Sequence, residues 1–92
     1  MTLSRDDLQA QLPEGWQGDE TGIERGFDFA NYEAGVAFAV RVALLAQRAD
    51  HHPDALTIEY KRVTVRYVTH SAGGVTGQDI RAANEVNAAF HA

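Results

Sequence analysis

The sequence predicts an α+β fold in which helices cover one face of a four-stranded antiparallel sheet. The chain has 92 residues, the length of a single domain, and we expect residues 1–92 to form one. Three segments have the apolar spacing of amphipathic helices, and two pairs of strand-like segments lie between them. The predicted order is therefore α-β-β-α-β-β-α. Strand pairs separated by a helix favour two layers, with an antiparallel sheet packed against the helices.

The first third of the chain predicts a short helix and two strands. Ser4 can cap a helix that contains Leu8, and Pro13 ends it. A short strand is expected to begin near Trp16. From Ile23 to Phe29 larger side chains alternate with polar residues or glycine, which is typical of a half-buried strand.

The middle of the chain predicts a long helix followed by a hairpin. Asn31 is a suitable N-cap, and an apolar stripe runs through residues 32–48. We expect this helix to end before Pro53, because the residue before a proline disfavours helical geometry. Residues 56–69 alternate as two strands around a turn at Lys61-Arg62. That turn would pair Tyr60 with Val63, Ile58 with Val65, and Leu56 with Tyr67.

The last segment predicts a third helix after a glycine-rich loop at residues 71–77. Thr76 can cap it, with Asp79 at the third helical position in a variant of the capping box. Four strands leave two free edges, which favour association with another copy of the chain. We therefore expect a homodimer or homotetramer.

Composition excludes several classes of protein. The chain is 45% hydrophobic and 23% charged, as in ordinary globular proteins, and no apolar run approaches the ~18 residues of a membrane span. There is no signal-peptide-like segment and no cysteine, which fits a cytoplasmic protein without disulfides or thiol catalysis. The net charge of −5 argues against nucleic acid as a partner. We expect neither a nucleic-acid partner nor a membrane partner.

Three histidines are the candidates for catalysis. His51 and His52 follow the long helix, and His70 ends the predicted hairpin, so all three could share one pocket. Near pH 7 imidazoles can hold one proton donor and one acceptor together, which suits elimination or addition of water. A polar loop and a zinc site are alternatives. The zinc site lacks both an H-E-x-x-H motif and a cysteine, so we expect no metal.

The histidines belong to a pattern that spans residues 4–90. His-His-Pro begins at His51, His70 follows nineteen positions later, and Asp79 follows nine positions after that. The pattern resembles the pterin-4a-carbinolamine dehydratase family. The other matching residues are Gly15-Trp16, Phe27-Asp28-Phe29, Phe38 to Ala43, Asp50, Asp54, Tyr60, Val63, Thr69, Ala72-Gly73-Gly74 and Thr76.

The resemblance implies a fold and an activity. The family has the same α-β-β-α-β-β-α order, and it dehydrates 4a-hydroxytetrahydropterins to quinonoid dihydropterins without a metal or other cofactor. This reaction recycles the pterin used by aromatic amino acid hydroxylases, so such an enzyme is an expected pathway partner. By position, the resemblance implies His51, His52 and His70 as catalytic residues and Trp16, Asp79 and Asp50 as substrate-binding residues.

The roles of these residues follow from the implied reaction. His52 or His51 would protonate the leaving hydroxyl, and His70 would accept or orient the N5 proton. Asp79 would orient an imidazole, cap the last helix, or do both. Trp16 would either pack beside the pterin or belong to the core.

Two departures from the family pattern and two other functions remain open. Many relatives have glutamate at the position of Gln47, four residues before His51, and the segment between Pro53 and Val63 is one residue longer than in many of them. The alternatives are a dimerising or coactivator-like binding protein, and a related enzyme of molybdopterin or other pterin metabolism.

Overall fold

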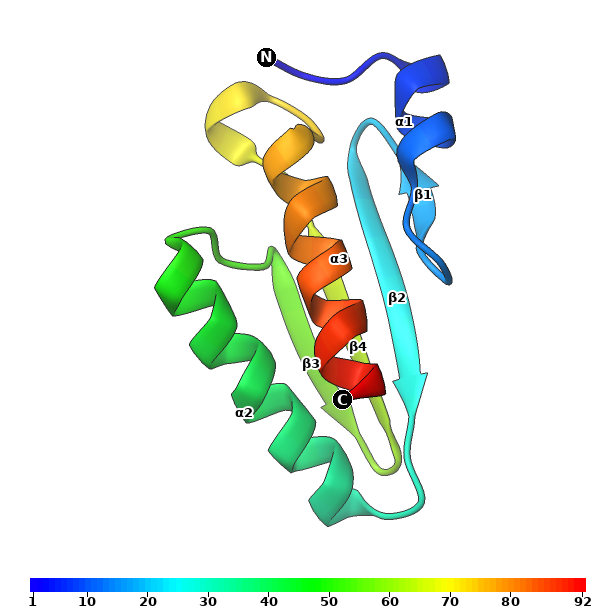
Figure 1. The fold of residues 1–92 in the computed structure, drawn as a ribbon, viewed down its shortest axis with the longest axis vertical. Helices are drawn as coiled ribbons and strands as arrows, with labels where there is room; N and C mark the ends of the chain where they lie inside the picture. The colour runs from blue at the N-terminus through cyan, green and yellow to red at the C-terminus, as the bar shows by residue number, and fades with distance from the viewer.

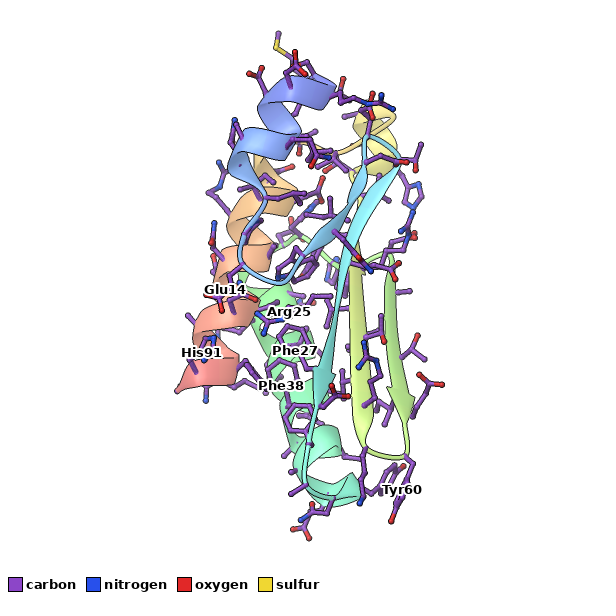
Figure 2. All side chains as sticks on the ribbon, turned by 90° about the vertical axis from the view of Figure 1, so that its right-hand side faces the viewer. Glu14, Arg25, Phe27, Phe38, Tyr60 and His91 are labelled. Atoms are coloured by element: carbon purple, nitrogen blue, oxygen red, sulfur yellow. The ribbon has the colours of Figure 1, made fainter.

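The structure is a computed structural model that describes all residues from 1 to 92. It contains four strands in one sheet and three α-helices, so the predicted α+β fold class is confirmed. Figure 1 shows α2 and α3 running along the sheet, and the turned view in Figure 2 shows the helices on one side of it. In chain order the elements are α1 (Arg5–Gln11), β1 (Gln17–Asp19), β2 (Gly22–Asp28), α2 (Tyr32–Ala49), β3 (Ala55–Glu59), β4 (Arg62–Tyr67), the 3-10 turn η1 (His70–Ala72) and α3 (Gly77–His91).

The sheet has the strand order β1-β2-β4-β3, and every neighbouring pair is antiparallel. The two hairpins are therefore joined through β2 and β4, which leaves β1 and β3 as edges. The strand residues that face the helices form the core with the inner faces of α1, α2 and α3. The largest side chains that are almost completely buried there are Tyr67, Phe27, Leu8 and Ile23.

The predicted register of the β3–β4 hairpin is wrong by two residues. Ile58 pairs with Val63 and Leu56 pairs with Val65, so the turn is formed by Tyr60 and Lys61. A shift of two residues keeps the same side chains on the same face, because the period of a strand is two. The alternation of apolar residues therefore determined the face but not the register.

The end of the hairpin also differs from the prediction. β4 stops at Tyr67, and His70 begins the turn η1 instead of ending a strand. A single bridge between Thr69 and Gly74 closes this turn, and Gly73 within it has a φ of 80°. That left-handed geometry favours glycine. The turn brings the chain directly to the start of α3.

None of the helices in this structure is both long enough and apolar enough to span a bilayer.

Candidate active site

The three predicted catalytic histidines lie near the end of α2, the start of β3, the turn η1 and the start of α3. α2 ends at Asp50, whose φ of 52° and ψ of 38° are left-handed and reverse the chain. The amide of His51 then donates to the carbonyl of Ala46, 3.1 Å away. This helix end directs His51 toward α3, whereas His52 returns toward α2. Asp50, predicted to bind substrate, is exposed and forms the helix end itself.

His51 contacts Asp79 through one ring nitrogen. Its Nε2 lies 2.6 Å from Oδ1 of Asp79, and the side chains are 14% and 0% exposed. The other carboxylate oxygen, Oδ2, accepts from the hydroxyl of Thr69 and from the amide of Thr76, each at 2.8 Å. Asp79 therefore completes the predicted capping box of α3 and holds His51 as well. Both of the roles considered for it are present in the structure.

His52 has a neutral partner. Its Nε2 lies 3.1 Å from Oε1 of Gln47, one turn back along α2, and both residues are exposed. An amide oxygen can only accept a hydrogen bond, so Nε2 carries the proton in this contact.

His70 has a charged partner on the surface. Its Nε2 lies 2.5 Å from Oδ1 of Asp54, which precedes β3, and the His70 side chain is 77% exposed. The guanidinium of Arg66 approaches the other oxygen of Asp54 at 3.4 Å. The hydrogen bond from His70 and the nearby charges of His70 and Arg66 hold the pKa of Asp54 below its usual value of 3.8. This carboxylate was not predicted as a site residue.

The observed hairpin register explains why Asp54 reaches His70. The amide of Asp54 donates to the carbonyl of Arg66 at 2.7 Å, which ties the start of β3 to the end of β4. The sequence separates Asp54 and His70 by sixteen positions. Only the pairing of the two strands brings them together, so a correct register would have been needed to find this contact.

Trp16 lies in the core. Its side chain packs against Phe27 and Tyr67, and its indole nitrogen donates to Asn87 at 2.8 Å. The residue is only 5% exposed, as the core alternative predicts. Tyr67, which the sequence suggested only as a strand residue, lies between Trp16 and His51.

One feature is common to the three imidazoles. Each uses Nε2 for its protein partner, so Nδ1 is the nitrogen left for another molecule. The bonds also link the residues into one region, because Thr69, which donates to Asp79, immediately precedes His70. A small cavity of about 80 Å³ lies beside His51 and is also lined by Gln78, Arg81 and Glu85 of α3.

The largest hollow in the molecule lies elsewhere. It is an open groove of about 710 Å³ along α2 and the end of α3, and none of its lining residues is a histidine. Exposed Val40 and Leu44 form part of its wall. The groove is mainly apolar, and arginine is the only charged residue type in its lining.

Comparisons with known proteins agree with the resemblance in the sequence. A family model described as pterin 4 alpha carbinolamine dehydratase matches residues 1–89. A relative from Natronomonas pharaonis, named after this dehydratase, is 47% identical over 85% of this chain and 84% of its own length. A relative from Halobacterium salinarum with the same name is 45% identical over 92% of both chains.

Two solved structures share the fold. One, described as a transcriptional coactivator/pterin dehydratase from Brucella melitensis, has a TM-score of 0.89 and 34% identity, and the match covers 98% of this chain and 99% of that one. The other, described as a pterin dehydratase-like protein identified as a RuBisCO assembly factor in the alpha-carboxysome, has a TM-score of 0.67 and 21% identity. The match covers 82% of this chain and 86% of that one.

The family model covers nearly the whole chain, and both named relatives exceed 40% identity over most of their length. The three histidines that suggested the family in the sequence also lie at one end of the fold, each with Nδ1 free. The chain belongs to the pterin-4a-carbinolamine dehydratase family.

Proposed function

We propose that this protein dehydrates a 4a-hydroxytetrahydropterin to the quinonoid dihydropterin by histidine acid–base catalysis. The observation that carries the proposal is the common arrangement of His51, His52 and His70, each held at Nε2 with Nδ1 left for substrate. Family membership supplies the substrate class. The reaction needs one group that gives a proton and another that takes one, and imidazoles can do both near neutral pH.

The proposed reaction conserves protons. A protonated imidazole, His52 or His51, donates its Nδ1 proton to the 4a hydroxyl as the C4a–O bond breaks, and the oxygen leaves as water. The electron pair of the N5–H bond forms the N5=C4a double bond, and His70 takes or orients the N5 proton through its own Nδ1. The carboxylates of Asp79 and Asp54 accept hydrogen bonds from Nε2 of His51 and His70, so Nδ1 is the nitrogen that would exchange a proton with the substrate.

The other predicted site residues fit this proposal in different ways. Asp79 acts on His51 and not directly on the pterin, since its two oxygens are occupied by His51, Thr69 and Thr76. Asp50 shapes the turn that precedes the histidines. Trp16 supports the site from within the core, behind Tyr67. Recycling of pterin for an aromatic amino acid hydroxylase remains a prediction from the family resemblance.

The direct test mixes the protein with chemically generated 4a-hydroxytetrahydropterin and follows the quinonoid product in the ultraviolet. We expect acceleration over buffer and a loss of roughly 10²–10⁴-fold in kcat/KM for His52→Ala and for His70→Ala. His91→Ala is the matched control, because His91 is an exposed histidine at the end of α3. No acceleration by the unmodified protein would refute the proposed activity, and full activity in either variant would remove that histidine from the mechanism.

Self-association is the second part of the proposal. β3 is an edge strand, and α2 exposes Val40 and Leu44 at 53% and 54%. Exposed apolar side chains near an open groove favour contact with another copy. The Brucella melitensis relative is also described as a transcriptional coactivator, so a binding role is the alternative. Light scattering at micromolar concentration should show a dimer or tetramer, and a monomer would contradict this expectation.

A further inference from the structure

The ring of Tyr67 lies nearly parallel to the imidazole of His51. The two ring centroids are 5.5 Å apart and the planes differ by 15°, so the rings are stacked. Tyr67 is 2% exposed and belongs to β4, one of the two central strands, which pairs with both β2 and β3. Its position is therefore determined by the sheet.

The opposite neighbour of Tyr67 is also fixed. The ring of Trp16 lies 6.2 Å from that of Tyr67, and the indole nitrogen of Trp16 donates to Oδ1 of Asn87 on α3. Arg25 of β2 donates to the same oxygen at 2.9 Å. The row of side chains from Asn87 through Trp16 and Tyr67 thus ends at His51.

The contacts of His51 with Asp79 and Tyr67 restrict different movements. The bond to Asp79 determines which nitrogen points into the protein. A ring held by one hydrogen bond can still rotate about its Cβ–Cγ bond, because this torsion of histidine has a broad minimum. A parallel ring against the imidazole face opposes that rotation. Arg81 and Glu85 line the small cavity beside His51, so an imidazole rotated into it would meet charged groups.

We propose that Tyr67 is a positioning residue for His51, whose ring keeps Nε2 on Asp79 and Nδ1 directed toward the substrate. The assignment of Nδ1 to the substrate rests on the proposed function, whereas the contact itself does not.

The aromatic face, and not the hydroxyl, carries this role. Burial raises the pKa of Tyr67 to about 12, and the charges of Glu85 and Asp79 act in the same direction. The phenol therefore stays neutral where imidazoles exchange protons. Tyr67→Phe keeps the aromatic ring that stacks on His51. Tyr67→Leu replaces that ring with an aliphatic side chain that is also apolar.

The test observes the ring N–H of His51 by ¹⁵N–¹H NMR. A ring proton held by a buried carboxylate exchanges slowly and gives a signal, which the variant His51→Gln identifies by its loss. We expect the signal in the unmodified protein and in Tyr67→Phe, and its loss in Tyr67→Leu. Phe27→Leu is the matched control, since Phe27 is equally buried and also contacts Trp16. It should keep the signal.

Kinetics supply the second measurement. Tyr67→Leu should lower kcat about tenfold or more with a smaller change in KM, because misplaced catalytic groups slow the chemical step. Tyr67→Phe should restore most of kcat. The inference is overturned if Tyr67→Leu keeps the N–H signal, or if Phe27→Leu loses it to the same extent. If the signal depends on Tyr67 but the unmodified protein has no dehydratase activity, the proposed function fails and the positioning contact stands.

Discussion

Two histidine–aspartate pairs lie at the same end of this molecule, one inside the protein and one on its surface. His51 and Asp79 are 2.6 Å apart, and His70 and Asp54 are 2.5 Å apart, through the same atoms. The inner side chains are 14% and 0% exposed, whereas the outer ones are 77% and 30% exposed. Water competes for the outer pair and hardly reaches the inner one, so equal distances do not imply equal strength.

Asp79 and Asp54 also differ in the groups that balance their negative charge. Asp79 accepts from three donors, and none of them is lysine or arginine; the hydroxyl of Thr69 and the amide of Thr76 supplement His51. Asp54 shares its charge with Arg66, which in turn pairs with Glu24 at 3.2 Å. The inner pair is therefore part of the fold, because it caps α3. The outer pair belongs to a surface network of charges that salt can screen.

Removal of Asp79 should have the largest effect on stability. Asp79→Ala deletes a helix-capping contact and leaves the Thr76 amide and the His51 ring without their acceptor. We expect a loss of about 2–4 kcal/mol in the free energy of unfolding, measured by urea denaturation, from a lost cap and unsatisfied buried donors. Asp79→Asn should lose less, because its amide oxygen still accepts one bond.

Asp54→Ala is the matched variant for the outer pair. Its effect should be clearly smaller than that of Asp79→Ala, and the difference from the unmodified protein should shrink further in high salt. If Asp79→Ala and Asp54→Ala lowered the free energy of unfolding equally, the difference in burial between the two pairs would have no effect on their strength.

The titration of Asp54 should reveal the outer pair directly. Carboxyl ¹³C NMR is expected to give a pKa below 3.8, and His70→Ala should move it back toward that value. A carboxyl whose pKa is depressed by folding contributes stability above its unfolded pKa, and that contribution is lost as the pH falls through the folded value. The window is therefore acidic, below about 3.8, and not near neutrality.

Asp19 provides an internal reference for this titration. Hydrogen bonds from the side chain and amide of Thr21 lower its pKa, independently of His70. His70→Ala should leave Asp19 unchanged while Asp54 shifts. A pKa of Asp54 that does not respond to His70 would mean that the contact is absent in solution.

The inner pair was more predictable from the sequence than the outer one. Thr76 and Asp79 lie three positions apart, so a local capping rule predicts the position of that carboxylate at the start of α3. Asp54 meets His70 only through the pairing of β3 with β4. Alternation of apolar residues predicts the buried face of a hairpin but allows shifts by two, which is how the register was predicted wrongly.

The stacking of Tyr67 on His51 could not be predicted from the sequence, for a related physical reason. The alternating pattern predicted Tyr67 as a strand residue, and in the structure its side chain is buried. It did not indicate which residue outside the sheet would cover the ring. The position of His51 over Tyr67 depends on the left-handed end of α2 at Asp50. A non-glycine residue takes that conformation there, which composition and spacing do not predict. The candidate site residues came from the sequence pattern and the family resemblance, whereas the partners of His52 and His70 came from the structure.

The smallest expected effect on activity concerns His52, whose hydrogen-bond partner Gln47 carries no charge. Gln47→Glu would place a carboxylate where Oε1 now lies 3.1 Å from Nε2, and so create a third pair of the outer type. Both residues are exposed, and exposed ion pairs contribute at most about 1 kcal/mol, which corresponds to less than one pH unit.

If His52 donates the proton to the leaving hydroxyl, Gln47→Glu should extend activity toward higher pH by less than one unit, because the carboxylate favours the protonated imidazole. Gln47→Ala, which removes the partner without adding charge, is the control and should not shift the profile in that direction. If NMR titration shows that Gln47→Glu raises the pKa of His52 while the activity profile stays unchanged, His52 is removed from the acid role and His51, the histidine whose partner is buried, is left as the proton donor.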